Sequence, residues 1–446
     1  MTEINDSSYR ENHINSIRDY LQNNCTERED YLLGSEMEFF VVKEESGAAV
    51  TYFEENGIKD ILRMLAEKGW SVCERNEEYI LCLKKDEDEI NLEPGGQFEL
   101  SFAPRENLSR LVSAFFSVCE DIVPILNSLD YSLISLGYQP VTSIDSIPLL
   151  PKERYKHMYK HFKKRGKYAH NMMKATSSLQ ISLDYSSEDD FAKKFAAASW
   201  LIPIVYALFD NAPLFEGEEA SSWAIRSQIW CNCDDDRCRL PEGVLDPDFS
   251  FADYATYIVD MPAIFDPKNP GNYTHDLSFA EVLKTSDLSR DIIEHMLTMS
   301  FTDIRAKGYL EIRMADTLPY PYNFGYLSLI TGLLYDEENL ERLYNLARKT
   351  GLKSIFSTQD GIPHQGVNIK YTGGRDIADW GEELMNMASS ALDSEARRYL
   401  DDLREFLQEY CPPRRAYRAG SGDGDVIETA EAIEYSSLNK ILKGKL

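Results

Sequence analysis

Residues 93 to 102 read Glu93-Pro-Gly-Gly-Gln-Phe-Glu-Leu-Ser-Phe102 and predict a turn that leads into a β-strand. Pro and Gly favour tight turns, and side chains on a strand alternate between its two faces. Gln97, Glu99 and Ser101 therefore share one face, while the Phe and Leu residues between them share the other. The strand has one acidic face and one apolar face.

Three further stretches repeat this alternation. They are Glu36-Met-Glu-Phe39, Leu179-Gln-Ile-Ser-Leu-Asp184 and Tyr309-Leu-Glu-Ile-Arg-Met314, and none of their polar positions holds a Lys. If the four strands lie side by side, carboxylates about 5 Å apart repel by roughly 3 kcal/mol per pair at an effective dielectric constant of about 20. Such a cluster needs cations and indicates divalent metal held by oxygen ligands. The alternative is four unrelated edge strands with solvated outer faces.

The composition limits the possible partners. The 446 residues suffice for one large or two ordinary domains. With 47 basic and 75 acidic residues the net charge is -28, which argues against a nucleic-acid-binding protein or one attracted to anionic membranes. The acidic N-terminus lacks the features of signal and transit peptides, and no run of 18 apolar residues occurs. We therefore expect a cytoplasmic protein without nucleic-acid or membrane partners, whose oligomeric state the sequence leaves open.

The eight cysteines are few for this length and predict no disulfide framework. Cys82 and Cys119 lie among apolar residues, as buried core thiols do. Cys231, Cys233 and Cys238 follow a C-x-C-x4-C spacing without a nearby His, which disfavours a structural zinc site.

Strands and helices alternate up to about residue 330, after which the chain is largely helical. Strands are expected at 32–42, 70–84, 89–102, 133–139, 179–184 and 309–314, and helices at 6–27, 58–68, 107–129, after Pro151, and at 190–210, 287–299, 324–352, 376–409 and 427–443. Asn107 and Ser187 are candidate helix caps, and residues 419–425 are expected to form a loop. This order predicts a single α+β domain with a mostly antiparallel sheet.

Basic residues gather in two places. Eight Lys and Arg residues lie between Lys152 and Lys167, where they form either a solvated helix face or a rim that faces phosphate. Arg226 and Arg237 stand in an aromatic setting. A planar guanidinium suits carboxylate recognition through two hydrogen bonds, although a surface salt bridge explains these residues equally well.

Six stretches together resemble the glutamate-cysteine ligases of the plant and proteobacterial type, which belong to the glutamine synthetase superfamily. They are Gly34–Glu38, Glu93–Ser101, Pro151–Tyr155, Thr176–Asp184, Arg226–Trp230 and Tyr309–Asp316. The resemblance covers about residues 30–330 and is weak beyond. It implies an α+β fold in which a curved, mostly antiparallel sheet forms a funnel-like active site covered by helices. A single catalytic domain would span residues 1–446, with a helical portion over about 331–446.

The resemblance also implies an activity and a set of site residues. The activity is ATP-dependent ligation of L-glutamate to L-cysteine, with Mg2+ or Mn2+ as cofactor and ATP as co-substrate, in glutathione biosynthesis. The implied metal positions are Glu36, Glu38, Glu93, Glu99, Gln180 and Glu311. Lys152, Arg154, Tyr155 and Arg237 would bind the nucleotide, Arg226, Tyr309 and Arg313 the other substrates, and Arg313, Glu99 and Glu311 would be catalytic.

Three alternatives stay open at this point. A related ligase would join glutamate to a different amine or act in ergothioneine synthesis. A non-catalytic relative would keep the sheet only to bind metal, which the retention of five glutamates together with Arg313 disfavours. A glycosidase with paired carboxylates would not explain so many acidic residues beside arginines.

Overall fold

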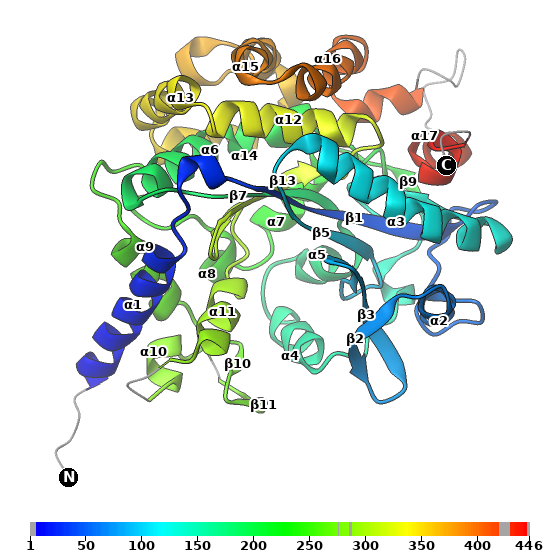
Figure 1. The fold of residues 1–446 in the computed structure, drawn as a ribbon, viewed down its shortest axis with the longest axis horizontal. Coiled ribbons are helices and arrows are strands. Elements are labelled where there is room, and N and C mark those ends of the chain that lie inside the picture. Colours follow the sequence, from blue (N-terminus) through cyan, green and yellow to red (C-terminus); the bar gives the residue numbers. More distant parts are fainter. Residues whose placement is uncertain (1–5, 275, 285–287, 419–428, 444–446) are drawn as a thin grey trace.

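The computed structural model describes residues 6–274, 276–284, 288–418 and 429–443, and its centre is a nine-stranded antiparallel sheet (Figure 1). The strands are β1 Leu33–Lys43, β2 Ser71–Asn76, β3 Tyr79–Lys85, β4 Asp88–Leu92, β5 Phe98–Arg105, β6 Tyr131–Ile134, β7 Ser178–Leu183, β12 Ile304–Ala306 and β13 Leu310–Asp316. Their order is β12-β13-β7-β1-β5-β4-β3-β2, with β6 paired to β1. The four alternating stretches form β13, β7, β1 and β5, so the prediction that they lie side by side is confirmed.

The helices before residue 330 surround this sheet. They are α1 Asp6–Asn23, α2 Ile58–Glu67, α3 Leu108–Ser128, α4 Glu153–Phe162, α5 Ala169–Ala175, α6 Glu188–Leu208, α7 Ile225–Cys231, α8 Asp235–Cys238, α9 Phe251–Asp260, α10 Phe279–Val282, α11 Arg290–Thr298 and α12 Tyr322–Leu334. Two small antiparallel ribbons, β8 Leu214–Phe215 with β9 Glu218–Glu219 and β10 Phe265–Asp266 with β11 Asn269–Tyr273, complete this part.

The apolar face of the sheet is covered by three long helices. Met37, Leu100, Ile181 and Ile312 are fully buried on that face. Helices α3, α6 and α12 contact the strands there, and Figure 1 shows α3 and α12 on one side of the sheet and α4, α5, α7 and α8 on the other. The acidic face is therefore the face turned toward α4, α5 and α7.

Two predicted caps hold the long helices. The Asn107 side chain accepts a hydrogen bond from the Arg110 backbone N–H at 3.1 Å, which confirms it as the cap of α3. Ser187 caps α6 by accepting from Asp190 N–H at 3.2 Å. In a full capping box the Asp190 carboxylate would accept from the backbone N–H of the cap residue, Ser187. Here it accepts from the backbone N–H of Ser186, so only half of the box forms.

Helices α3 and α6 are long and apolar enough to cross a membrane by length and composition alone. In the fold, 89% of the most apolar window of α6 and 50% of that of α3 are buried within the protein. Packing inside the molecule therefore accounts for the apolar character of α6 and for much of that of α3.

The C-terminal third is largely helical, as predicted. It consists of α12, α13 Glu337–Thr350, α14 Leu352–Gln365, α15 Ile377–Ala391, α16 Ser394–Glu409, α17 Thr429–Ser436 and α18 Leu438–Ile441. The expected helix over 324–352 is two helices, α12 and α13, and the loop expected at 419–425 lies outside the described residues. The α+β fold class is confirmed, and the single domain stays a prediction.

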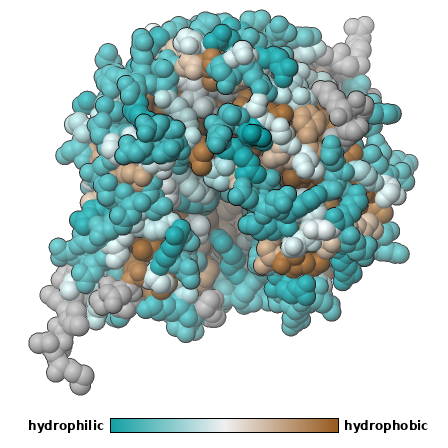
Figure 2. Space-filling view, viewed as in Figure 1, coloured by the Kyte–Doolittle hydropathy of each residue, from teal (hydrophilic) through white to brown (hydrophobic). Residues whose placement is uncertain are grey.

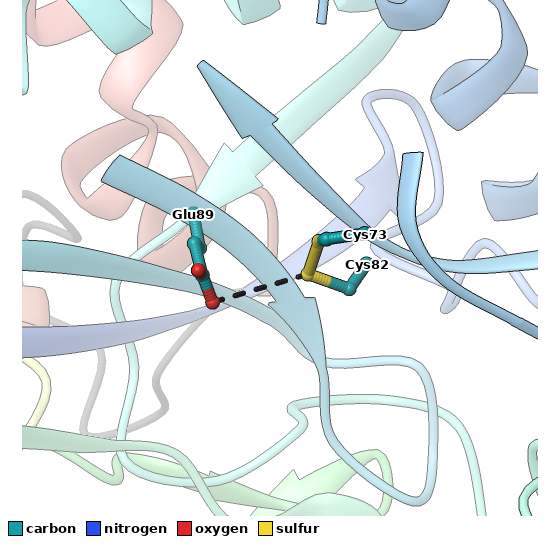
Figure 3. Close-up of side chains that lie close together, drawn as sticks. All are labelled: Cys73, Cys82 and Glu89. Atoms are coloured by element: carbon teal, nitrogen blue, oxygen red, sulfur yellow. Dashed lines mark hydrogen bonds between the residues drawn. A yellow bond between two sulfur atoms is a disulfide. The ribbon is translucent and has the colours of Figure 1, made fainter. Parts of the chain in front are cut away.

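The prediction that Cys82 is a free core thiol is wrong. Cys73 on β2 and Cys82 on β3 form a disulfide, with the carboxylate of Glu89 4.0 Å from the Cys82 sulfur (Figure 3). The register of the two strands shifts between Val72 and Glu74, and this irregularity brings Cys73 beside Cys82. Cys119 is a buried free thiol, as expected.

The cap of α3 gives a first testable prediction. Asn107→Ala removes the side-chain acceptor at the helix start and should lower the free energy of unfolding by about 1 kcal/mol. The melting temperature and urea unfolding measured by circular dichroism check this. Asn345→Ala is the matched control, because Asn345 lies exposed inside α13, where alanine is the better helix former. An equal loss in both variants would contradict the capping role.

Candidate active site

Four glutamates line one cavity of about 220 Å³ on the acidic face of the sheet. Glu36 and Glu38 come from β1, Glu99 from β5, and Glu93 from the turn before β5. The register places Glu38 directly opposite Glu99 and Glu36 directly opposite Gln180 of β7. Figure 2 shows this face of the molecule hollowed below the sheet, between the part with α1 and α11 and the part with β2, β3 and α4.

Hydrogen bonds orient two members of this cluster. Glu38 accepts from the Ser178 backbone N–H at 2.7 Å and from the Gln180 amide at 2.8 Å. The Gln180 carbonyl oxygen in turn accepts from Arg313 at 2.5 Å. The side chain of Gln180 therefore connects the acidic cluster to a basic one, and its predicted role at a metal stays a prediction.

Burial and mutual repulsion shift the acids of the cluster. Burial, with the charge of Glu93 added, raises the pKa of Glu38 from its ordinary 4.5 to about 7. Burial also raises the pKa of Glu99 well above its ordinary value, with Glu36 and Glu93 as the next causes. The pKa of Glu36 is raised by burial, which the cations across the cavity offset in part. These shifts match the self-repulsion expected of the acidic face without a bound cation.

The opposite side of the same cavity is basic. Arg226 of α7, Arg305 of β12, Arg313 of β13 and Lys307 in the turn between those two strands line it. The cavity therefore has an acidic end and a basic end.

Glu311 lies behind the basic end and does not line the cavity in this structure. Its carboxylate is fully buried and lies 2.7 Å from Arg305, 2.8 Å from Lys307 and 2.8 Å from Arg313. Burial alone would raise its pKa, but these three cations hold the pKa of Glu311 well below its ordinary value. Protein cations compensate the charge of Glu311 here, and its predicted role as a metal ligand stays a prediction.

Arg226 lines the cavity with its guanidinium engaged on the sheet. Its terminal nitrogens donate to the backbone carbonyls of Met314 at 3.0 Å and Arg313 at 2.8 Å, and it lies over the Trp230 ring at 5.6 Å. These contacts fix its position against β13. Binding of a substrate carboxylate by Arg226 stays a prediction.

The residues predicted to bind nucleotide divide into two groups. Arg154 and Tyr155, at the start of α4, line the cavity, and the Tyr155 hydroxyl donates to the Leu92 carbonyl at 3.0 Å. Lys152 pairs with Glu74 at 2.8 Å and lines an adjoining pocket of about 510 Å³, to which Arg154 also contributes. Arg154 thus lies where the two pockets meet.

Two predicted site residues lie away from the cavity wall. Arg237 is fully buried and is held by Asp234 at 3.2 Å and by the Met299 carbonyl at 3.4 Å. The guanidinium neutralises Asp234 inside the protein, and the assignment of Arg237 to the nucleotide stays a prediction. The Tyr309 hydroxyl accepts from Lys307 at 3.1 Å and so supports a cavity residue from behind.

Sequence reasoning missed Arg305 and Lys307. Both precede Tyr309 at alternate positions, and Arg305 lies directly opposite Glu311 across the β12–β13 pair. The two-residue spacing continues that of Glu311 and Arg313. This alternation was the available signal.

The sequence profile of glutamate-cysteine ligase family 2 (GCS2) matches residues 32–432. The chain belongs to this family. The match extends far beyond residue 330, where the sequence alone indicated only a weak resemblance.

Members of the family from plants are similar over most of their length. Chloroplastic glutamate–cysteine ligase B of Oryza sativa subsp. japonica is 30% identical over 397 residues, covering 86% of this chain and 79% of the relative. The chloroplastic enzyme of Arabidopsis thaliana is 30% identical over 383 residues, covering 84% and 72%. Because these relatives are chloroplastic, the cytoplasmic location stays a prediction.

A crystal structure shares the fold. The glutamate–cysteine ligase of Francisella tularensis in complex with AMP superposes with a TM-score of 0.56 at 12% identity, covering 93% of this chain and 89% of that one. At this identity the likeness shows the fold alone.

The raised pKa of Glu38 predicts a pH dependence of stability. Between about pH 4.5 and pH 7 the folded protein keeps a proton that the unfolded chain has released, so stability in a metal-free buffer should fall as pH rises through this window. Gln does not titrate in this window, so Glu38→Gln should reduce this fall in stability. Melting temperatures measured across the window in EDTA check this, with Glu405→Gln on the exposed side of α16 as the control. A pH profile unchanged by Glu38→Gln would contradict the assignment.

Proposed function

We propose that the chain joins the γ-carboxylate of L-glutamate to the amine of L-cysteine and converts ATP to ADP and phosphate. The product is γ-glutamylcysteine, the precursor of glutathione. Membership of glutamate-cysteine ligase family 2 and the plant relatives of that name support the activity. The AMP bound to the Francisella enzyme supports the use of an adenine nucleotide.

The observation that carries the proposal is a cavity with acidic and basic ends. In the first step the γ-carboxylate of glutamate attacks the γ-phosphorus of ATP and forms an acyl phosphate. The amine of cysteine then attacks the acyl carbon and phosphate leaves. Because a carboxylate approaches a polyphosphate in the first step, negative charge must be compensated on both partners. Arg226, Arg305, Lys307 and Arg313 provide positive charge on one side of the cavity.

The acidic end fits magnesium by its donor chemistry. Its side chains offer carboxylate and amide oxygens, the ligands that Mg2+ prefers, and Mn2+ accepts the same donors. Among the described residues, three metal-type ligand atoms within 4.8 Å of one another occur only at Cys73, Cys82 and Glu89, where both sulfurs belong to the disulfide (Figure 3). The carboxylates therefore surround the cavity without converging on one point.

Glu36, Glu38, Glu93 and Glu99 would hold the metal, with Gln180 beside them. Bound Mg2+ would screen the charge of the phosphates and of the attacking carboxylate. The chain itself orients the reaction: Gln180 and Glu311 fix Arg313 toward the cavity at 2.5 and 2.8 Å. Arg154 and Lys152 bind the polyphosphate from the adjoining pocket. Arg226 on α7 binds a substrate carboxylate.

The activity is tested by ADP release with glutamate and each of a series of amines. We expect ADP release to require ATP, glutamate and Mg2+ or Mn2+, and to be fastest with cysteine, because the acidic cluster repels itself without a divalent cation. Excess EDTA should abolish turnover and added Mg2+ should restore it. Undiminished turnover in EDTA would refute the mechanism. Faster turnover with alanine or 2-aminobutyrate than with cysteine would assign the chain to another ligase branch.

Glu99→Gln tests the acidic cluster directly. Gln keeps the size of the side chain and loses its charge, so we expect turnover to fall below about one hundredth of the normal rate. In EDTA the variant should be at least as heat-stable as the unsubstituted protein, because a buried, repelled carboxylate is removed. Glu89→Gln is the matched control, since Glu89 lies on the neighbouring strand β4 and pairs with Lys84 at 3.0 Å. Near-normal turnover of Glu99→Gln would show that Glu99 is only a strand residue.

A further inference from the structure

Lys307 is a cation of the cavity wall to which neither the sequence motifs nor the comparisons assign a role. It lies in the turn between β12 and β13, and its side chain is 18% exposed. Its ammonium lies 2.8 Å from Glu311 and donates to the Tyr309 hydroxyl at 3.1 Å. An ammonium has three donors. These two partners leave one N–H without an acceptor among the described residues.

Lys307 lies among three other cations at the basic end of the cavity. Arg226, Arg305, Lys307 and Arg313 carry four positive charges; Glu311 and Asp303 face them at this end, and Glu36 and Glu38 attract them from the acidic end. The carboxylate of Asp303 is already engaged by the Tyr206 hydroxyl at 2.5 Å. Uncompensated charge is costly inside a protein. The four neighbouring cations repel one another, and an anion bound between them in the cavity lowers this repulsion.

Lys307 differs from its three neighbours in how firmly it is held. Arg226 donates to two backbone carbonyls, Arg305 to Glu311 and to the carbonyls of Thr298 and Ser300, and Arg313 to Glu311 and Gln180. The side chains of Arg305 and Arg313 are 9% and 13% exposed, less than that of Lys307. A lysine ammonium is also a compact charge on a flexible stem. Lys307 is therefore the cation of this set that can follow a moving anion.

We propose that Lys307 is a catalytic residue that binds an oxygen of the γ-phosphoryl group while it is transferred. The assignment rests on the proposed function. In that step the bond between the γ-phosphorus and the bridging oxygen breaks, and its electron pair stays on ADP. A bond forms between the γ-phosphorus and an oxygen of the glutamate γ-carboxylate. Lys307 keeps its proton throughout and neutralises charge on the transferred oxygens.

Two substitutions of Lys307 test this role in the full-length protein. Lys307→Met keeps the length of the side chain and loses the charge, and we expect kcat to fall about a hundredfold or more. The KM values for ATP, glutamate and cysteine should change by less than about threefold, because the contact strengthens in the transition state. Lys307→Arg keeps the charge and should recover at least about a tenth of the normal kcat.

The control substitution is Lys370→Met. Lys370 also forms an ion pair, with Asp376 at 2.8 Å, but is 64% exposed and lies outside the cavity. It should leave kcat unchanged. Melting temperatures of all variants show whether the fold is kept. If Lys307→Met does not fold, Lys307→Gln, which loses the charge but keeps a polar end group, is judged by the same limits.

A partial reaction separates the two chemical steps. With hydroxylamine in place of cysteine, any acyl phosphate is trapped as the γ-glutamyl hydroxamate. Lys307→Met should lose hydroxamate formation and γ-glutamylcysteine formation in parallel, because the defect precedes the acceptor. A kcat within threefold of normal, a loss confined to the KM for ATP, or intact hydroxamate formation would overturn the role of Lys307. Failure of the unsubstituted protein to release ADP with glutamate and cysteine would instead overturn the proposed function.

Discussion

The repulsion between carboxylates on adjacent antiparallel strands is the constraint on which the rest of the structure depends. Antiparallel pairing places Glu38 directly opposite Glu99, with Glu36 two residues away on the same face. Side chains that face each other on neighbouring strands lie about 5 Å apart, a distance at which like charges destabilise a sheet. Burial makes this worse, which is why the pKa of Glu38 rises to about 7. The acidic face is stable only with protons, cations or both.

The fold compensates for this cost on the other face of the same strands. Met37 and Leu100, which alternate with the glutamates, are fully buried; α3 contacts both of their strands, and Asn323 of α12 contacts Met37. Full burial of each such side chain contributes roughly 1.5–3 kcal/mol. A slip of one residue in the register would turn these apolar side chains to the cavity and the acids to the core. The apolar layer therefore holds the carboxylates in their unfavourable arrangement.

Two-residue periodicity was enough to predict which residues share the acidic face and that their strands are neighbours. It also predicted that Arg313 lies near this face, because Arg313 alternates with Glu311. Periodicity does not say which opposite charge a side chain meets, and for this reason it did not predict that Arg305, Lys307 and Arg313 surround Glu311. The Cys73–Cys82 disulfide depends on an irregular register that no spacing rule reveals. The aromatic neighbourhood of Arg237 is typical of buried ion pairs as well as of ligand sites, so it did not reveal the pairing with Asp234.

The proposed reaction needs both the acidic end and the basic end of the cavity. Metal ligands alone would attract cations and repel a polyphosphate, and arginines alone would bind phosphate without activating a carboxylate toward it. Gln180 is neutral and contacts Glu38 with its amide nitrogen and Arg313 with its amide oxygen. A carboxylate in its place would add to the acidic repulsion, and a cation would repel Arg313. Gln180 therefore donates to the acidic end and accepts from the basic end without adding charge to either. This keeps the two clusters from pairing directly with each other, which would close the site.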